Sequence, residues 1–129
     1  MPHIQIDYSG NLEPDVDIGA LCEAVRSSAS QIDALPIPGI RVRAIKVDHY
    51  AIADGDPKHG FVDISVRLRE GRTARVKQQV IERIFESARA FLSSAMNIRS
   101  IALSAELREI DANLAPKCGT IRDHLEEQQ

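Results

Sequence analysis

The stretch FVDISVRLREGRT (residues 61–73) shows a β-strand giving way to a helix within a few residues. In residues 62–68 every second residue is apolar, which is the period of a strand with one buried face. Glu70-Gly71-Arg72 ends this pattern, and Thr73 is a good N-cap for a helix. The apolar positions that follow have helical spacing: Val80, Ile81, Ile84, Phe85, Ala88, Phe91, Leu92 and Ala95.

The same order of elements is found near the N-terminus. Ile4 and Ile6 alternate with polar residues and predict a strand, and residues 9–11 (Ser-Gly-Asn) interrupt it. Pro14 and Asp15 suit the first turn of a helix, so we expect the first helix to begin there. Its apolar stripe consists of Ile18, Leu21, Cys22, Val25, Ala29 and Ile32.

Each expected helix leads into a further strand. Residues 35–39 contain two prolines and a glycine and stop the first helix, and a β-rich run extends from Ile40 to Tyr50. Its apolar phase changes between Ala44 and Ile45, which is compatible with a β-bulge. After the second helix, a strand is expected through Ile101, Leu103, Ala105 and Leu107.

The chain therefore reads as two βαβ units in tandem, covering about residues 2–52 and 61–108, within a single domain of residues 1–129. Right-handed crossovers would make the two strands of each unit parallel. The predicted fold is α/β (α+β): a four-stranded sheet with both helices on one face. A sheet with one uncovered face needs a partner, and residues 109–129 are too polar to cover it, so we expect a closed oligomer.

Composition excludes several classes of function. The formal net charge is −3 and charges of both signs are interspersed, whereas a nucleic-acid-binding protein shows a clustered basic face. No apolar run reaches membrane-spanning length, and the first residues do not resemble a signal peptide. Cys22 and Cys118 lie far apart, in no metal-ligand spacing, and are expected to be free thiols of a cytoplasmic protein.

An ordered set of segments carries a family resemblance. The start Pro2-His3-Ile4-Gln5-Ile6 resembles the tautomerase superfamily, and the chain up to about Leu107 is similar to its 5-carboxymethyl-2-hydroxymuconate isomerases. The similar segments are Gly39–Arg43, Val47–Asp48, Ala53–Gly55, Phe61–Val62, Gly71–Arg72, Gln78–Gln79 and Ala102–Ser104. Residues 68–73 and 40–42 also resemble the arginine-bearing segments of the short 4-oxalocrotonate tautomerases.

The resemblance implies a βαββαβ monomer, a homotrimer, no metal and no organic cofactor. It implies an isomerase that converts 5-carboxymethyl-2-hydroxymuconate, an enol with several carboxylates, to its 2-oxo-3-ene tautomer in the breakdown of homoprotocatechuate and related aromatic acids. Three alternatives stay open: another tautomerase activity (a decarboxylase, a dehalogenase or a phenylpyruvate-type tautomerase), a non-catalytic assembly module, and a plain ligand-binding protein.

Pro2 is the candidate base. Once Met1 is removed, its nitrogen is a secondary amine, whose pKa falls in an apolar site close to cations. A proton could then pass from the enol oxygen to the far carbon of the conjugated chain. The alternative interpretation is that a proline at position two merely permits removal of Met1.

Arginines are the candidate carboxylate ligands, because a guanidinium binds a carboxylate through two parallel hydrogen bonds. Arg72 lies where a strand meets a helix N-terminus, a favourable place for an anion, although a solvated surface charge is the alternative. The resemblance points to Arg41 as a second ligand, and to Tyr50 as an aromatic wall of the pocket, where the related enzyme has another aromatic residue. Arg43 shares a strand face with Arg41, and we expect a structural ion pair for it. No partner pattern supports catalysis or metal binding by the remaining polar candidates: His3, His49, His59, His124, Asp48, Asp63, Ser65, Ser104 and Cys22.

Overall fold

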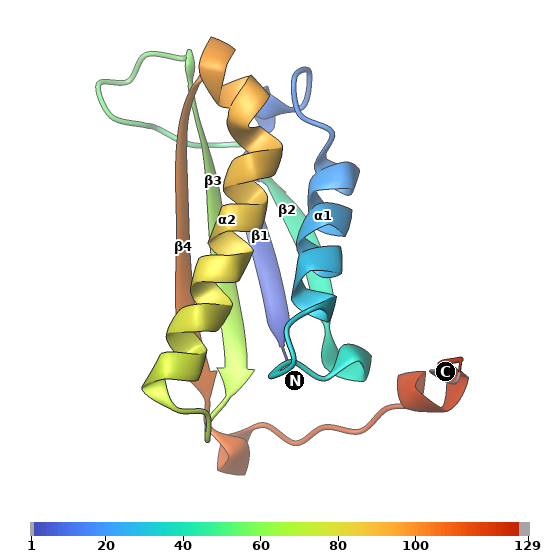
Figure 1. Cartoon of the computed structure of the whole chain (residues 1–129). Helices are drawn as coiled ribbons and strands as arrows, with labels where there is room; N and C mark the ends of the chain where they lie inside the picture. Colours follow the sequence, from blue (N-terminus) through green and yellow to red (C-terminus); the bar gives the residue numbers. More distant parts are fainter. Residues whose placement is uncertain (1, 127–129) are drawn as a thin grey trace.

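The computed structural model describes residues 2–126 and shows one mixed sheet with two helices (Figure 1). The main elements in chain order are β1 (His3–Ser9), α1 (Ile18–Ser30), β2 (Arg41–Val47), β3 (His59–Arg69), α2 (Ala74–Ile98) and β4 (Ser100–Ile110). Short 3₁₀ turns lie at Gly10–Leu12, Ile37–Gly39, Ala112–Leu114 and Ile121–His124. None of the described helices is long and apolar enough to cross a membrane.

The strand order is β2-β1-β3-β4. β1 is parallel to β2, and β3 is parallel to β4, so each βαβ unit forms as predicted. The two units meet through an antiparallel pairing of β1 with β3, in which His3 faces Arg67 and Ile6 faces Ile64. This pairing places the start of β1 beside the end of β3. Pro2, Arg41 and Arg72 therefore all lie at the same end of the sheet.

Both helices cover the same face of the sheet (Figure 1). On this face the inward residues of the two central strands are fully buried: Ile4, Ile6, Val62, Ile64, Val66 and Leu68. The helices contribute Leu21, Val25 and Ala29 from α1, and Val80, Ile84, Ala88, Leu92 and Ala95 from α2. The predicted apolar stripes thus form the core, which fixes the strand ends that carry the candidate site.

The sequence predicted the start of α2 correctly but not the start of α1. Thr73 caps α2 as expected, its hydroxyl oxygen accepting from the backbone N–H of Val76 at 3.2 Å. The expected start of α1 at Pro14 is wrong, because the helix begins at Ile18. Asp17 is its N-cap and accepts from the backbone N–H of Ala20 at 3.0 Å. The preceding residues form the Gly10–Leu12 turn, which buries the Leu12 side chain.

β2 is shorter and more regular than expected. It ends at Val47, not at Tyr50, and pairs with β1 residue for residue from Arg41 to Val47, without a bulge. The change of apolar phase has a simpler cause. Ile45 follows Arg41 and Arg43 at alternate positions, so it lies on the helix-free face, where its side chain is 45% exposed.

The helix-free face of the sheet is mostly polar. Alternation along β1 places His3, Gln5 and Asp7 on this face, opposite the buried isoleucines. Its groups bond to one another: the Ser104 hydroxyl donates to Asp63 at 2.8 Å, and the Gln5 amide donates to Asp7 at 3.1 Å. A partner on this face would therefore meet hydrogen-bonding groups more than apolar surface.

Residues after β4 run along the end of the sheet at which β1 begins, toward the loop between α1 and β2 (Figure 1). Their first turn is tied to the end of β3. The Arg69 guanidinium donates to the carbonyl oxygens of Ala112 and Ala115, both at 3.4 Å. The Glu70 carboxylate accepts from the backbone N–H of Ala112 at 3.0 Å. These contacts place the C-terminal segment on the same end of the molecule as Pro2.

Candidate active site

Pro2 is buried at the start of β1. Its carbonyl oxygen accepts from the backbone N–H of Arg41 at 3.1 Å, which extends the β1–β2 pairing by one residue. Continuing the β1–β3 register in the same way sets Pro2 against Leu68, a fully buried residue. The candidate base thus has apolar surroundings. Met1, whose removal the proline-base hypothesis requires, lies outside the described residues.

His3, next to Pro2, lies in a cationic environment. Its side-chain Nδ1 is buried and has no hydrogen-bond partner among the described residues. Burial, and then the positive charges of Arg67, Arg41 and Arg43, hold the pKa of His3 below its usual value of 6.5. This lowered pKa favours the neutral form of His3. The same two influences, burial and nearby cations, would lower the pKa of an amine at Pro2.

Arg41 begins β2 at the edge of the sheet. Its guanidinium donates to the carbonyl oxygen of Gly39 at 3.2 Å, and its side chain lines a cavity of about 210 Å³ between the Pro36–Gly39 loop and the C-terminal segment. Its backbone is bonded to Pro2, so this arginine stands beside the candidate base. The arrangement can bring a carboxylate ligand and a proton acceptor to one place.

Arg72 is neither a solvated charge nor a free group at the helix N-terminus. Its guanidinium Nη2 and Nε donate to the carbonyl oxygen of Ala34 at 2.9 and 3.3 Å, and its Nη1 donates to that of Arg69 at 3.0 Å. Gly71, with a φ of 116°, makes the turn that directs the chain into these contacts. Arg72 thus ties the loop after α1 to the junction of β3 and α2. A guanidinium has five N–H donors, so donors remain for a carboxylate.

Arg43 does not form the ion pair expected for it with any residue that the structure describes. Its guanidinium instead donates a hydrogen bond to the side-chain oxygen of Gln5 at 3.4 Å, on the helix-free face. Its positive charge also contributes to the lowered pKa of His3. Arg43 thus belongs to the polar surface of the sheet as well as to the cationic surroundings of Pro2.

Tyr50 lies at the other end of the sheet from Pro2. It follows β2, its ring packs edge-on against Phe61 with centroids 6.1 Å apart, and it is 37% exposed. β1 and β2 run parallel, so the seven residues of β2 separate Tyr50 from the start of β1 by roughly 20 Å, at about 3.3 Å per residue. Within one chain the structure does not bring Tyr50 and Pro2 together.

Three of the other candidates, His59, Asp63 and Ser104, have local hydrogen-bond partners. His59 bridges two groups, its Nδ1 lying 2.7 Å from the Ser100 hydroxyl and its Nε2 lying 2.8 Å from the Asp54 carboxylate. This bridge ties the loop before β3 to the start of β4. Among residues 2–126, no three His, Cys, Asp or Glu side chains are grouped as metal ligands.

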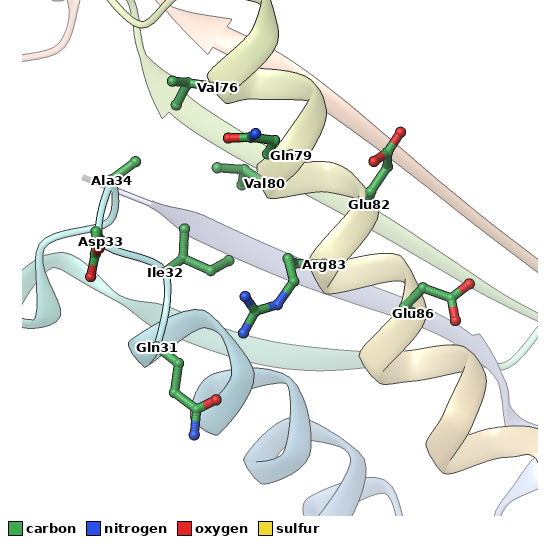
Figure 2. Close-up of a pocket in the computed structure, with 10 residues that line it drawn as sticks. All are labelled: Gln31, Ile32, Asp33, Ala34, Val76, Gln79, Val80, Glu82, Arg83 and Glu86. Atoms are coloured by element: carbon green, nitrogen blue, oxygen red, sulfur yellow. The ribbon is translucent and has the colours of Figure 1, made fainter.

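A larger cavity, of about 690 Å³, lies between the helices (Figure 2). It is bordered by the end of α1 and by the first half of α2. Three of its side chains, Asp33, Glu82 and Glu86, are carboxylates, and Arg83 is its one cationic residue. An anionic substrate would be repelled there. Size alone therefore does not identify the site.

Sequence patterns missed two groups of cations at the Pro2 end. Arg67 pairs with His3, where β1 and β3 run antiparallel. Aligning the alternating polar residues of these two strands would have indicated this pair. Lys117 and Arg122 share the 210 Å³ cavity with Arg41. They lie in a segment without periodic pattern, so no signal in the sequence pointed to them.

Comparison with known proteins identifies the family of the chain and agrees with the fold. The family model described as 5-carboxymethyl-2-hydroxymuconate isomerase matches residues 2–125. The 5-carboxymethyl-2-hydroxymuconate Delta-isomerase of Escherichia coli is 30% identical over 114 residues, covering 88% of this chain and 90% of the relative.

Solved structures give the same result. A 5-carboxymethyl-2-hydroxymuconate delta-isomerase superposes with a TM-score of 0.90 at 30% identity, over 100% of this chain and 95% of its own. The isomerase from Deinococcus radiodurans R1 gives a TM-score of 0.87 at 28% identity, over 98% and 95%. A fused 4-OT described as a symmetric trimer shares the fold, with a TM-score of 0.62 at 19% identity, over 88% and 91%. The chain therefore belongs to the 5-carboxymethyl-2-hydroxymuconate isomerase family and is an isomerase.

Proposed function

We propose that Pro2 is the catalytic base that moves the proton in the conversion of 5-carboxymethyl-2-hydroxymuconate to its 2-oxo-3-ene tautomer. The observation that carries this proposal is the position of Pro2: it is buried at the start of β1 and bonded through its backbone to Arg41. Cations that lower the pKa of His3 lie around the adjacent residue. An amine in such a place is unprotonated more readily than one in water.

The reaction breaks one O–H bond and forms one C–H bond. The Pro2 amine takes the proton from the hydroxyl on C2, the double bonds move from C2=C3 and C4=C5 to C2=O and C3=C4, and the proton is delivered to C5. Negative charge spreads along the conjugated chain during the transfer. Arginine side chains that hold the carboxylates stabilise this charge, most effectively where water is excluded.

Arg41 and Arg72 are the proposed carboxylate ligands. Arg41 stands next to Pro2, and Arg72 keeps donors beyond its three backbone contacts. Because Arg72 also ties two loops together, its role in binding is combined with a role in stability. No metal and no organic cofactor takes part in the proposed proton transfer.

We further propose a homotrimer in which Tyr50 reaches the site of a neighbouring subunit. Tyr50 is too far from the Pro2 of its own chain, yet its ring lies partly exposed beside a pocket of about 390 Å³. The helix-free face of the sheet offers hydrogen-bonding groups to a partner, and structures described as trimers share the fold.

The proposed setting is the cytoplasm, in the degradation of homoprotocatechuate and related aromatic acids. Both cysteines are free, which agrees with a reducing compartment. The test of the function is a spectrophotometric assay of the enol acid with a chain that begins at Pro2. Comparison with phenylpyruvate enol separates this activity from a phenylpyruvate-type tautomerase, and no turnover of either enol would contradict the proposal.

A further inference from the structure

The C-terminal segment forms one wall of a cavity beside the candidate active site. This cavity, of about 210 Å³, lies between the Pro36–Gly39 loop and residues 117–122, with Arg41 on its border. A water molecule occupies about 30 Å³ of liquid, so the cavity has room for a carboxylate and a methylene group.

The charge of this cavity suits an anion. Three of its side chains, Arg41, Lys117 and Arg122, are cationic, and no described acidic residue lines it. Lys117 and Arg122 form no ion pair with any residue between 2 and 126. Asp123 follows Arg122 in the chain but does not border the cavity. The 690 Å³ cavity between the helices has the opposite balance, with three carboxylates and one arginine.

The position of the cavity links it to the reaction. Arg41 borders it with its side chain and is bonded through its backbone to the carbonyl oxygen of Pro2. The start of the C-terminal segment is fastened by Arg69 and Glu70 at the end of β3, next to the start of β1. Lys117 and Arg122 are therefore brought to the Pro2 end of the sheet by specific contacts.

We propose that Lys117 and Arg122 form a subsite that binds a third carboxylate of the substrate. The inference rests on the proposed function, because 5-carboxymethyl-2-hydroxymuconate carries two terminal carboxylates and a further one on its carboxymethyl group. The proposed chemistry places proton transfer at C5, the carbon that bears this group. The C-terminal segment would thus make the enzyme prefer tricarboxylate enols to dicarboxylate enols.

Kinetics with two substrates test the subsite. The double variant Lys117→Ala/Arg122→Ala should raise the KM for 5-carboxymethyl-2-hydroxymuconate by about tenfold, since two exposed charge contacts together amount to about one power of ten in affinity. The KM for 2-hydroxymuconate, which lacks the carboxymethyl group, should change by less than about twofold, as should kcat for both. The exchange Lys117→Arg/Arg122→Lys, which keeps both charges, should restore the preference.

A matched control removes a cation that lies far from the cavity. Lys58→Ala removes an exposed cation at the opposite end of the sheet, where Lys58 lies 3.9 Å from Asp56, and should leave both KM values unchanged. Equal changes in KM for the two substrates, or none for either, in the Lys117→Ala/Arg122→Ala variant would overturn the proposal.

The rate of alkylation of Cys118 measures binding in this cavity without depending on turnover. Cys118 is exposed and borders the same cavity, so an anion bound there should slow its alkylation by iodoacetamide. Propane-1,2,3-tricarboxylate should protect Cys118 more than glutarate does, and only when Lys117 and Arg122 are present. Equal protection by the two acids would count against the subsite. If the wild type isomerises no enol acid but shows this protection, the proposed function fails while the subsite stands.

Discussion

The backbone N–H of Arg41 donates to the carbonyl oxygen of Pro2 at 3.1 Å, so the residue that begins β2 is held against the residue that precedes β1. This contact follows from the parallel pairing of the two strands in the first βαβ unit. It places the proposed base beside a proposed carboxylate ligand without any flexible loop between them. Precise placement of this kind favours reaction, because little freedom is lost when substrate binds.

Arg41→Ala should weaken both substrate binding and turnover. Loss of a charge-assisted contact in a desolvated site costs on the order of 2–5 kcal/mol, and its effect should fall on kcat/KM for mono- and polycarboxylate enols alike. Chemical denaturation should show a smaller change, because loss of a hydrogen bond such as that to the carbonyl oxygen of Gly39 costs about 1 kcal/mol. Nearly unchanged kcat/KM in Arg41→Ala would exclude Arg41 as a ligand.

Arg72→Ala should reduce both stability and activity. The substitution removes three hydrogen bonds to the carbonyl oxygens of Ala34 and Arg69, which we expect to lower the free energy of unfolding by about 1–3 kcal/mol. Urea denaturation measures this loss, and KM for the enol acid measures the binding role.

Two further substitutions, at the N-cap of α2 and on its exposed face, serve as controls for Arg72. Thr73→Ala removes the cap of α2 and should cost about 1 kcal/mol of stability while KM stays the same. Arg89→Ala removes an exposed pair with Glu86 and should alter neither quantity. If Arg72→Ala destabilises the chain but keeps the wild-type KM, Arg72 is structural only.

The predicted trimer can be checked together with Tyr50. Sedimentation of the folded protein should give three times the mass of the 14.2 kDa chain at micromolar concentration. Tyr50→Ala should lower kcat/KM in the intact trimer, because the aromatic wall of the neighbouring site is lost. A stable, fully active monomer would contradict both parts of this prediction.

Stability should depend on pH through His3. Its pKa is lowered in the folded protein by burial and by Arg67, Arg41 and Arg43, so the unfolded chain takes up the proton more readily. Folding stability should therefore decrease as pH falls through the unfolded value of 6.5, and it should be regained above that value. His3→Gln should flatten this part of the stability profile, as measured by urea denaturation from pH 5 to pH 8. An unchanged profile would mean that His3 does not sense those cations.

The sequence predicted the tandem βαβ units because alternation and helical spacing are strong in residues 62–68 and 80–95. It misplaced the start of α1, because proline suits the loop after the Gly10–Leu12 turn as well as it suits the first turn of an α-helix. It also could not predict the contacts of Arg72, which depend on a loop 38 residues away in the chain. Tyr50 could be recognised as an aromatic candidate, and its distance from Pro2 follows from the parallel pairing of β1 and β2.

The central claim is that the free amine of Pro2 is the base. In a chain that keeps Met1, the Pro2 nitrogen belongs to an amide and has no basic lone pair, so proton transfer by this route is impossible. Pro2→Ala is a weaker test, because a primary amine in the same place could still accept a proton.

The most direct measurement pairs intact-mass spectrometry with the enol-acid assay on two preparations, one beginning at Pro2 and one proven to retain Met1. Equal folding of the two is checked by circular dichroism. We expect full isomerase activity in the first preparation and a loss of at least about a hundredfold in kcat in the second, because a general base is removed. Full activity in the preparation that retains Met1 would falsify the proline-base mechanism.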